Sequence, residues 1–215
     1  MTTLLAICAG SAVPFRGDEL SAIAKQPLAG RVAITSAGVA GDVQADLKHH
    51  GGPDMAVHHY PFDHHAGWRE ELGDHPLLDQ PGAFGSNLSV LGLTESEVLL
   101  GDRFRLGTAL LEACQPRQPC WKIEHRFEAK GMVKRIMRTG RCGWFYRVVE
   151  AGEAEAGDKL ALVDRGLTDW PMARVFEAIW GTSTPPDAEL LREVTTLAPL
   201  ADKLRGQLLD KIGPK

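Results

Sequence analysis

The chain has 215 residues, of which 44% are hydrophobic and 24% are charged, and its formal net charge is −4 with histidine neutral. A chain of this length and composition can bury a hydrophobic core without disulfides or a structural metal. The negative balance argues against a general nucleic-acid binder or a protein that binds acidic membranes, because both need excess positive charge. The apolar stretch at residues 4–13 is too short to cross a bilayer and follows no Lys or Arg, so it is interpreted as a first strand.

Short apolar runs separated by Gly and Pro fill the first three-quarters of the chain and are typical of a β-barrel or sandwich. The predicted strands after the first are 31–35, 87–90, 103–106, 109–113, 144–149 and 159–163. Helical spacing of apolar residues predicts two helices among them, at residues 60–72 and 128–139. The sequence therefore predicts a mainly β fold with a few peripheral helices.

The pattern changes after Asp164, where three short amphipathic helices follow one another. They are predicted at 171–180, from Asp187 onward, and at 200–212, with a Pro-Pro break before the second. A bundle of about fifty residues is marginal alone, so we expect it to pack on the barrel or on a partner subunit. The predicted domains are a barrel over residues 1–163 and a three-helix domain over residues 164–215. If the chain associates, a two-fold homodimer is the expected form.

Four cysteines, Cys8, Cys114, Cys120 and Cys142, form no CxxC pair and fit neither a disulfide framework nor a zinc knuckle. With no export signal, the sequence predicts a cytoplasmic protein with free thiols. Cys120 ends a stiff segment, Pro116-Arg117-Gln118-Pro119-Cys120, and Lys122 follows it closely. Positive charge beside a cysteine favours the thiolate, which is the form that ligates a soft metal. The alternative is a buried structural cysteine.

Histidines gather in one stretch: seven of the eight lie between His49 and His75. Imidazole is a common metal ligand, which suggests a metal site, but no HExxH motif or paired cysteine supports it. The alternative is a mixture of core, capping and surface histidines. Within this stretch, His50-Gly51-Gly52-Pro53-Asp54 forms a loop whose backbone allows close approach of a ligand and can present N–H groups to a phosphate. An ordinary Gly-Pro turn explains the same residues.

Taken together and in order, these segments resemble the MOSC family (molybdenum cofactor sulfurase C-terminal domains), and most closely its bacterial hydroxylaminopurine-resistance, YiiM-like branch. The resemblance runs from about Ser21 to Val163, and the three-helix tail also resembles that branch. It is carried by residues 21–25, 41–42, 50–54, 59–61, 85–88, 92–95, 101–102, 116–120 and 143–144. One departure is Ser86, where the branch usually has a glutamate.

The resemblance implies a MOSC-type β-barrel with a groove for the molybdenum cofactor (Mo-molybdopterin). It implies that Cys120 is the metal ligand and that His59 and Lys25 join it as catalytic residues. The residues implied for cofactor binding are Lys25, His50, Gly51, Gly52, Asp54, Asn87, Arg117 and Lys122, with the three cations placed around the pterin phosphate.

The activity implied by the resemblance is reduction of N-hydroxylated compounds such as hydroxylaminopurine-type bases, a detoxification reaction. The electrons would come from a separate reductase, because the chain has no flavin, haem or iron–sulfur motif. Pyridoxal phosphate is not expected, because the domain that would bind it does not fit in this length. The alternatives are a cofactor or sulfur carrier without substrate turnover, a histidine-rich metalloprotein, and an inactive barrel whose helical tail mediates interactions.

Overall fold

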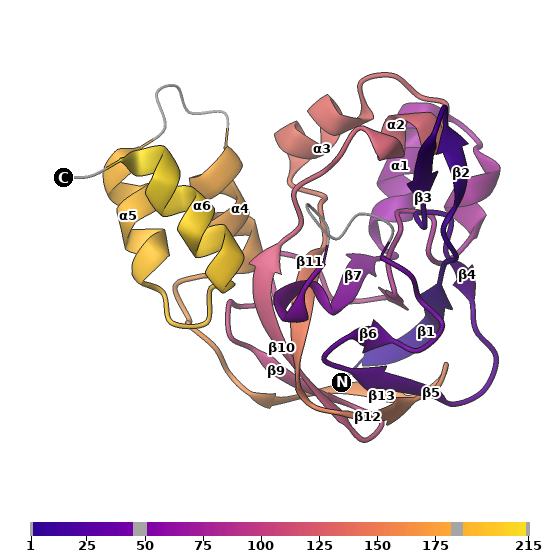
Figure 1. Ribbon diagram of the computed structural model, residues 1–215, viewed down its shortest axis with the longest axis horizontal. Helices are drawn as coiled ribbons and strands as arrows, with labels where there is room; N and C mark the ends of the chain where they lie inside the picture. The colour runs from indigo at the N-terminus through magenta and orange to yellow at the C-terminus, as the bar shows by residue number, and fades with distance from the viewer. Residues whose placement is uncertain (1, 45–50, 182–186, 214–215) are drawn as a thin grey trace.

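The structure is a computed structural model that describes residues 2–44, 51–181 and 187–213. Within this part of the chain, seven strands close into a barrel of mixed direction (Figure 1). Their order around the barrel is β13 (Lys159–Asp164), β9 (Arg103–Leu106), β10 (Ala109–Pro116), β11 (Trp144–Glu150), β7 (Val57–Pro61), β8 (Leu88–Val90) and β1 (Thr2–Ala9). Pairing of Thr2 with Leu160 closes the barrel, and only β7 and β8 among these neighbours run parallel.

Smaller strands extend or flank the barrel. Strand β4 (Gln26–Pro27) pairs with β1, and β2 (Val13–Arg16) and β3 (Glu19–Ser21) form a hairpin of their own. A three-stranded sheet contains β5 (Val32–Thr35), β6 (Gly38–Val39) and β12 (Gly152–Ala154). The period of two that the barrel requires is plain in β9, where Phe104 and Leu106 are buried while Arg103 and Arg105 are half-buried.

A second hydrophobic core lies between the barrel and a layer of helices. That layer contains α1 (His64–Leu72), the 3-10 turn η2 (Pro76–Asp79), α2 (Lys122–Arg126) and α3 (Met132–Thr139). Figure 1 shows α1, α2 and α3 gathered with the β2–β3 hairpin at one end of the barrel. Trp68, Phe84, Phe127 and Ile136 are buried there, and the Phe84 ring stacks on Tyr60 with centroids 4.1 Å apart. The outer face of the barrel at strand β7, where Tyr60 lies, therefore packs against these helices.

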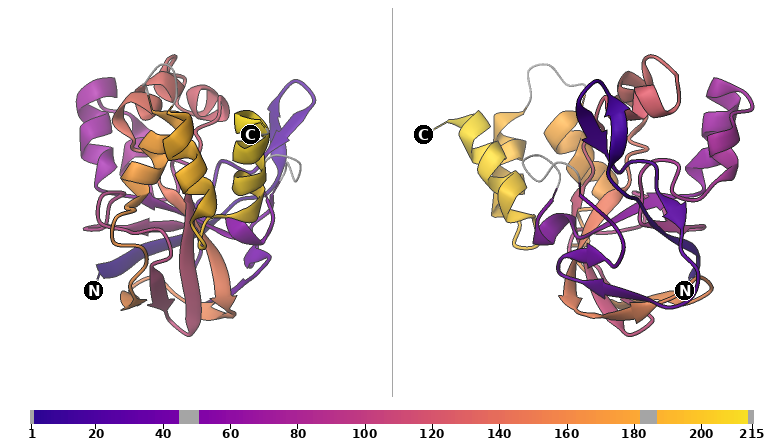
Figure 2. Two further views of the ribbon diagram at one scale, coloured as in Figure 1. Left: turned by 90° about the vertical axis from the view of Figure 1, so that its left-hand side faces the viewer. Right: turned by 45° about the vertical axis from the view of Figure 1, so that its right-hand side comes forward.

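The C-terminal helices are α4 (Met172–Trp180), α5 (Ala188–Thr196) and α6 (Asp202–Ile212). They lie together on one side of the barrel (Figure 2). Most of their buried residues, among them Val175, Val194 and Leu208, belong to the same hydrophobic cluster as the barrel core, while Phe176 belongs to the second core. The tail thus packs on the barrel, which is one of the two arrangements expected from the sequence. The division into two domains at residue 163 stays a prediction. No helix in the described residues is long and apolar enough to cross a membrane.

Two predicted helices begin later than expected. Residues Tyr60 and Pro61 end strand β7, and α1 begins only at His64. A residue before proline disfavours the helical region, so Tyr60 stays extended. The helix predicted at 128–139 begins at Met132, because Glu128 has a positive φ of 48° and Gly131 is left-handed. Strand β7 was not predicted, since all five of its residues are buried and show no alternation.

Asp54 joins the barrel to the C-terminal helices. It lies in the 3-10 turn η1 (Pro53–Met55), and its Oδ1 accepts a 2.8 Å hydrogen bond from Nε of Arg147 on β11. Its Oδ2 accepts from the backbone N–H of Asp202, the first residue of α6, at 3.0 Å. One carboxylate therefore pairs with a half-buried guanidinium and satisfies a free amide at a helix start.

We expect Asp54→Ala to lower the free energy of unfolding by about 1–3 kcal/mol, because it removes a charge-assisted pair and a cap together. Urea denaturation followed by circular dichroism measures the change. Asp79→Ala is the control: Asp79 pairs with Arg69 in solvent, where such a pair contributes about 0–1 kcal/mol. Equal losses in the two variants would contradict the linking role of Asp54.

Candidate functional site

A pocket lies where strands β7 and β11 face the helical layer. It brings together six residues singled out in the sequence: Lys25, Gly51, Asn87, Arg117, Cys120 and Lys122. Asp42, His58 and Phe145 also line it, together with Ser21, Ala22, Ile23, Val43, Gln44, Met55 and Gly85. The lining therefore comes from segments that are far apart in the chain. They include the end of the β2–β3 hairpin, β7, β11 and the segment after β10.

Asp42 organises one wall of the pocket. Its Oδ2 pairs with Nζ of Lys25 and accepts a 2.8 Å hydrogen bond from Nδ2 of Asn87. Its Oδ1 accepts from the backbone N–H of Gly10 at 2.8 Å. Burial lowers the pKa of Lys25, and the adjacent Asp42 carboxylate opposes that shift. The charge of Lys25 is therefore balanced by Asp42, which also holds its side chain at the wall of the pocket.

Asn87 links three segments of the chain through its side chain, and both hydrogens of its amide group are already donated. Its Nδ2 donates to Asp42 and, at 3.1 Å, to the carbonyl of Cys8. Its Oδ1 accepts from the backbone N–H of His58 at 3.0 Å. Asn87 therefore fixes the start of strand β7 relative to Asp42, which is a positioning task rather than direct binding.

Unlike Lys25, Arg117 has no carboxylate partner among the described residues. Its backbone N–H donates to the carbonyl of Gly143 at 3.0 Å. Its guanidinium makes no ion pair or hydrogen bond with any other residue that the structure describes, although burial lowers its pKa. A guanidinium stays protonated under physiological conditions. A half-buried, unpaired cation of this kind favours an anionic ligand.

Cys120 is half-buried, whereas Cys8, Cys114 and Cys142 are buried. Its Sγ accepts a long hydrogen bond, 3.4 Å, from the backbone N–H of Lys122. The β2–β3 hairpin packs on this turn: the Phe15 ring lies 5.9 Å from Trp121, and the Lys122 ammonium donates to the Leu20 carbonyl at 3.4 Å. The thiol is thus presented at the pocket by a braced turn, with Lys122 beside it.

We expect iodoacetamide to modify Cys120 alone in the folded protein, as read by peptide mass spectrometry. The other thiols are inaccessible, and burial raises the pKa of Cys8 to about 12 and raises the pKa of Cys142 as well. In denaturant all four cysteines should react, which is the control. Comparable native labelling of Cys8 or Cys142 would contradict the described burial.

The histidine that reaches the pocket is His58, not the predicted His59. Strand register pairs Phe145 with His58 and Trp144 with His59. Side chains of paired residues share a face of the sheet and alternate along each strand, so neighbouring histidines point in opposite directions. The His59 ring lies inside the barrel, stacked on Trp144 at 4.1 Å, with Nδ1 3.3 Å from the Tyr146 hydroxyl.

His58 is held in one tautomer. Its Nδ1 lies 3.1 Å from the Gly85 carbonyl, which can only accept, so Nδ1 carries the proton. The opposite nitrogen, Nε2, is buried and has no hydrogen-bond partner among the described residues. Burial, reinforced by the positive charge of Arg117, lowers the pKa of His58 well below its usual value. His58 therefore lines the pocket with a neutral ring whose buried Nε2 is a hydrogen-bond acceptor.

We expect these two buried histidines to make the fold less stable as pH falls. Burial lowers the pKa of His59 to about 3, whereas an unfolded histidine titrates near 6.5. Below that value the unfolded chain binds protons that the folded chain does not. Each histidine should then cost up to about 1.4 kcal/mol of unfolding free energy per pH unit.

The measurement is urea denaturation of the wild type and of His59→Phe between neutral pH and about pH 5. The variant keeps an aromatic ring against Trp144 but removes one titrating group, so its stability should fall less steeply with acid. Identical pH slopes for the two proteins would show that His59 titrates normally.

Other predicted residues lie elsewhere. Gly52 precedes η1 with a φ of 100° and does not line the pocket. Asp54 points to Arg147 and α6, as described above, so the structure does not bring it to the proposed ligand. His50 lies outside the described residues. Ser86 is buried and does not line the pocket, so the replacement of the usual glutamate leaves the described lining unchanged.

The remaining described histidines do not converge. His64 pairs with Glu95, His65 lies 2.9 Å from the Leu78 carbonyl, and His75 accepts from the backbone of Leu77. Among the described residues, no group of three His, Cys, Asp or Glu side chains is placed to hold a metal ion. The histidine-metal alternative therefore has no support in this part of the chain.

Among the pocket residues that the sequence analysis did not propose for the site, Asp42 and His58 are the two with titratable side chains. Asp42 stood in the Gly41-Asp42 segment of the family resemblance, and that segment was its only signal. His59 was chosen in place of His58 because strand β7 was not recognised. Without the strand, the sequence does not show which of the two adjacent histidines faces the pocket.

The fold and the pocket define a class: a closed β-barrel protein with a pocket lined by cationic side chains and one accessible thiol. A model of the MOSC domain family matches residues 46–161, more than half of the chain, and the chain belongs to this family. The predicted YiiM-like branch and the mainly β, MOSC-type barrel are both confirmed.

Three relatives illustrate the placement. The chain is 44% identical to the YiiM protein of Escherichia coli over 145 residues, covering 67% of this chain and 65% of that protein. The crystal structure of YiiM from Geobacillus stearothermophilus has a TM-score of 0.82 at 29% identity, covering 99% of this chain and all of that one. A Gibberella moniliformis protein named reductase is 38% identical over 187 residues, which is 86% of this chain and 33% of the fungal protein.

Proposed function

We propose that the pocket binds a molybdenum–pterin cofactor, with Cys120 as the protein ligand to the metal, and that the protein reduces N-hydroxylated compounds. The observation that carries the proposal is that one pocket contains an accessible thiol, Cys120, and a guanidinium, Arg117, that has no carboxylate partner among the described residues. MOSC domains are associated with this cofactor, and these two groups match its metal and its phosphate.

The donor set of the pocket fits such a group. Arg117 and Lys122 supply positive charge for a phosphate, while Lys25 is already neutralised by Asp42. Nε2 of His58 has no partner among the described residues and is an acceptor for one of the several N–H groups of a pterin ring. Thiolate is a soft ligand suited to a soft metal centre. Cation, acceptor and thiolate together match the three parts of the cofactor.

When bound, the metal centre supplies two-electron chemistry for cleaving an N–O bond. The overall reaction takes an N-hydroxylated compound, two electrons and two protons to the corresponding amine and water. The chain's own residues bind and orient: Cys120 ligates, and Arg117 and Lys122 neutralise the bound anion. The electrons would come from a separate reductase protein. The fungal relative, a longer chain named reductase, supports a reductive role.

We expect protein from a host that makes the cofactor to reduce a hydroxylaminopurine, with a chemical reductant in place of the natural donor. Cys120→Ser should fold and lose this activity, because a hydroxyl is a poor substitute for a thiolate ligand. Cys114→Ala, which alters a buried thiol outside the pocket lining, is the matched control and should stay active. Product formation followed by liquid chromatography measures both.

The outcomes separate the two classes of function. Full activity of Cys120→Ser would refute the ligand assignment. A wild-type protein that carries molybdenum but turns over no N-hydroxylated compound would refute the reductase activity and favour a cofactor carrier.

A further inference from the structure

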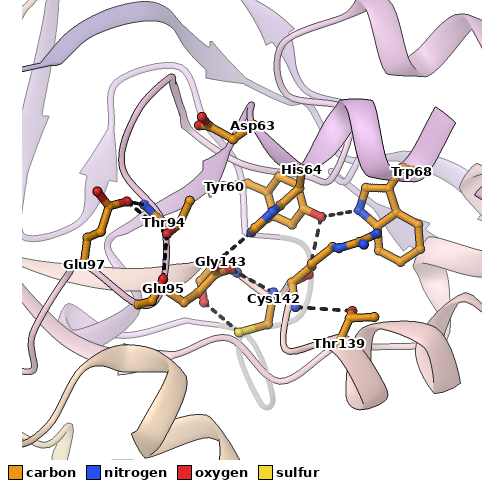
Figure 3. Close-up of polar contacts among 12 residues, drawn as sticks. Tyr60, Asp63, His64, Trp68, Thr94, Glu95, Glu97, Thr139, Cys142 and Gly143 are labelled. Atoms are coloured by element: carbon orange, nitrogen blue, oxygen red, sulfur yellow. Dashed lines mark hydrogen bonds and ion pairs between the residues drawn. The ribbon is translucent and has the colours of Figure 1, made fainter. Parts of the chain in front are cut away.

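Glu95 is a buried carboxylate outside the pocket, and it contacts a turn that touches pocket residues. Glu95 lies in the loop between β8 and β9, in the Gly92–Glu95 segment of the family resemblance, and its side chain is only 5% exposed. Its Oε1 accepts hydrogen bonds from the backbone N–H groups of Cys142, at 3.0 Å, and Gly143, at 2.7 Å (Figure 3). Its Oε2 lies 2.7 Å from Nε2 of His64, the first residue of α1.

The turn that Glu95 holds touches two groups of the pocket. The Gly143 carbonyl accepts from the backbone N–H of Arg117 at 3.0 Å. Gly143 also lies so close to strand β7 that an added Cβ would be 2.2 Å from the His59 carbonyl and 3.1 Å from Nε2 of His58. Its φ of 69° is left-handed, so glycine is required for both reasons. A shift of this turn would therefore move against the His58 ring and carry Arg117 with it.

We propose that Glu95 is a positioning residue of the pocket: it fixes the Cys142–Gly143 turn, and the turn sets the places of His58 and Arg117. This inference rests on the proposed function in one respect, that the pocket takes an anionic ligand. It also accounts for two segments of the family resemblance, residues 92–95 and 143–144, that the pocket lining leaves unexplained.

The charge of Glu95 matters for this role. Two successive N–H groups converge on one carboxylate oxygen, and such charge-assisted bonds are stronger than neutral ones. The other oxygen is bound by His64, so the buried carboxylate is satisfied on both sides. The start of the same turn is held separately, because the Tyr60 hydroxyl donates to the Arg141 carbonyl at 3.3 Å and accepts from Trp68 at 2.6 Å. Glu95 thus controls the last two residues of a turn whose start is already fixed.

The test compares Glu95→Ala and Glu95→Gln with Glu97→Gln, a nearby exposed carboxylate that accepts from the Thr94 backbone at 2.8 Å. Nuclear magnetic resonance reports the His58 imidazole and Arg117 amide signals directly. Titration with inorganic phosphate, the probe for the anion site, gives the affinity of the pocket. Thermal unfolding reports stability separately.

We expect Glu95→Ala to shift both signals and to weaken phosphate binding about tenfold or more, as loss of an outer hydrogen-bonding partner does in other sites. Glu95→Gln keeps the shape and one acceptor oxygen but loses the charge, so it should lie between Glu95→Ala and wild type. Glu97→Gln should behave as wild type. A purely structural role would lower the thermal stability of the variants without shifting the His58 and Arg117 signals.

A folded Glu95→Ala with wild-type His58 and Arg117 signals would overturn the proposal. If that variant does not fold, Glu95→Gln decides, and unchanged signals in it overturn the proposal equally. If the wild type does not bind phosphate, the anion site of the proposed function fails. The His58 and Arg117 signals of the variants would still decide whether Glu95 positions them.

Discussion

Antiparallel pairing of β11 with β7 is the constraint on which the site depends. Side chains alternate along both strands, so this register sends Trp144 and His59 into the barrel and Phe145 and His58 to the opposite face. The inward pair stacks in the core, and the outward pair lines the pocket. A slip of one residue would exchange the two histidines and leave the pocket without its acceptor nitrogen. The barrel core and the pocket therefore lie on opposite faces of the same two strands.

The second constraint is electrostatic. Three cations line the pocket, but Asp42 neutralises Lys25 and ties it to Asn87, which leaves Arg117 and Lys122 to meet a ligand. Among the described residues nothing of opposite charge pairs with Arg117. The backbone N–H of Arg117 donates to the carbonyl of Gly143, whose own N–H donates to Glu95. The pocket thus contains one ion pair, Lys25–Asp42, and two cations that have no carboxylate partner among the described residues. These two cations flank Cys120 in the sequence, and Cys120 is the one cysteine that is not buried.

Much of this arrangement follows from the sequence, because its strongest signals are local. Gly and Pro punctuation predicted the strands, and the proline-framed Cys120 with its flanking cations marked the pocket segment. What failed was information that depends on distant partners. Tyr60-Pro61 resembles a helix start, and β7 is buried along its whole length, so neither the strand nor the orientation of His58 was visible. The roles of Asp54 and Glu95 depend on bonds to residues 148 and 48 positions away, which no local pattern reveals.

The central claim is that Cys120 and the cations beside it hold a molybdenum cofactor. Its most direct test is the molybdenum content of wild type and Cys120→Ala, both purified from a host that makes the cofactor. We expect molybdenum near stoichiometry in the wild type and little in the variant. Zinc, copper or iron in place of molybdenum, or equal molybdenum in both proteins, would contradict it.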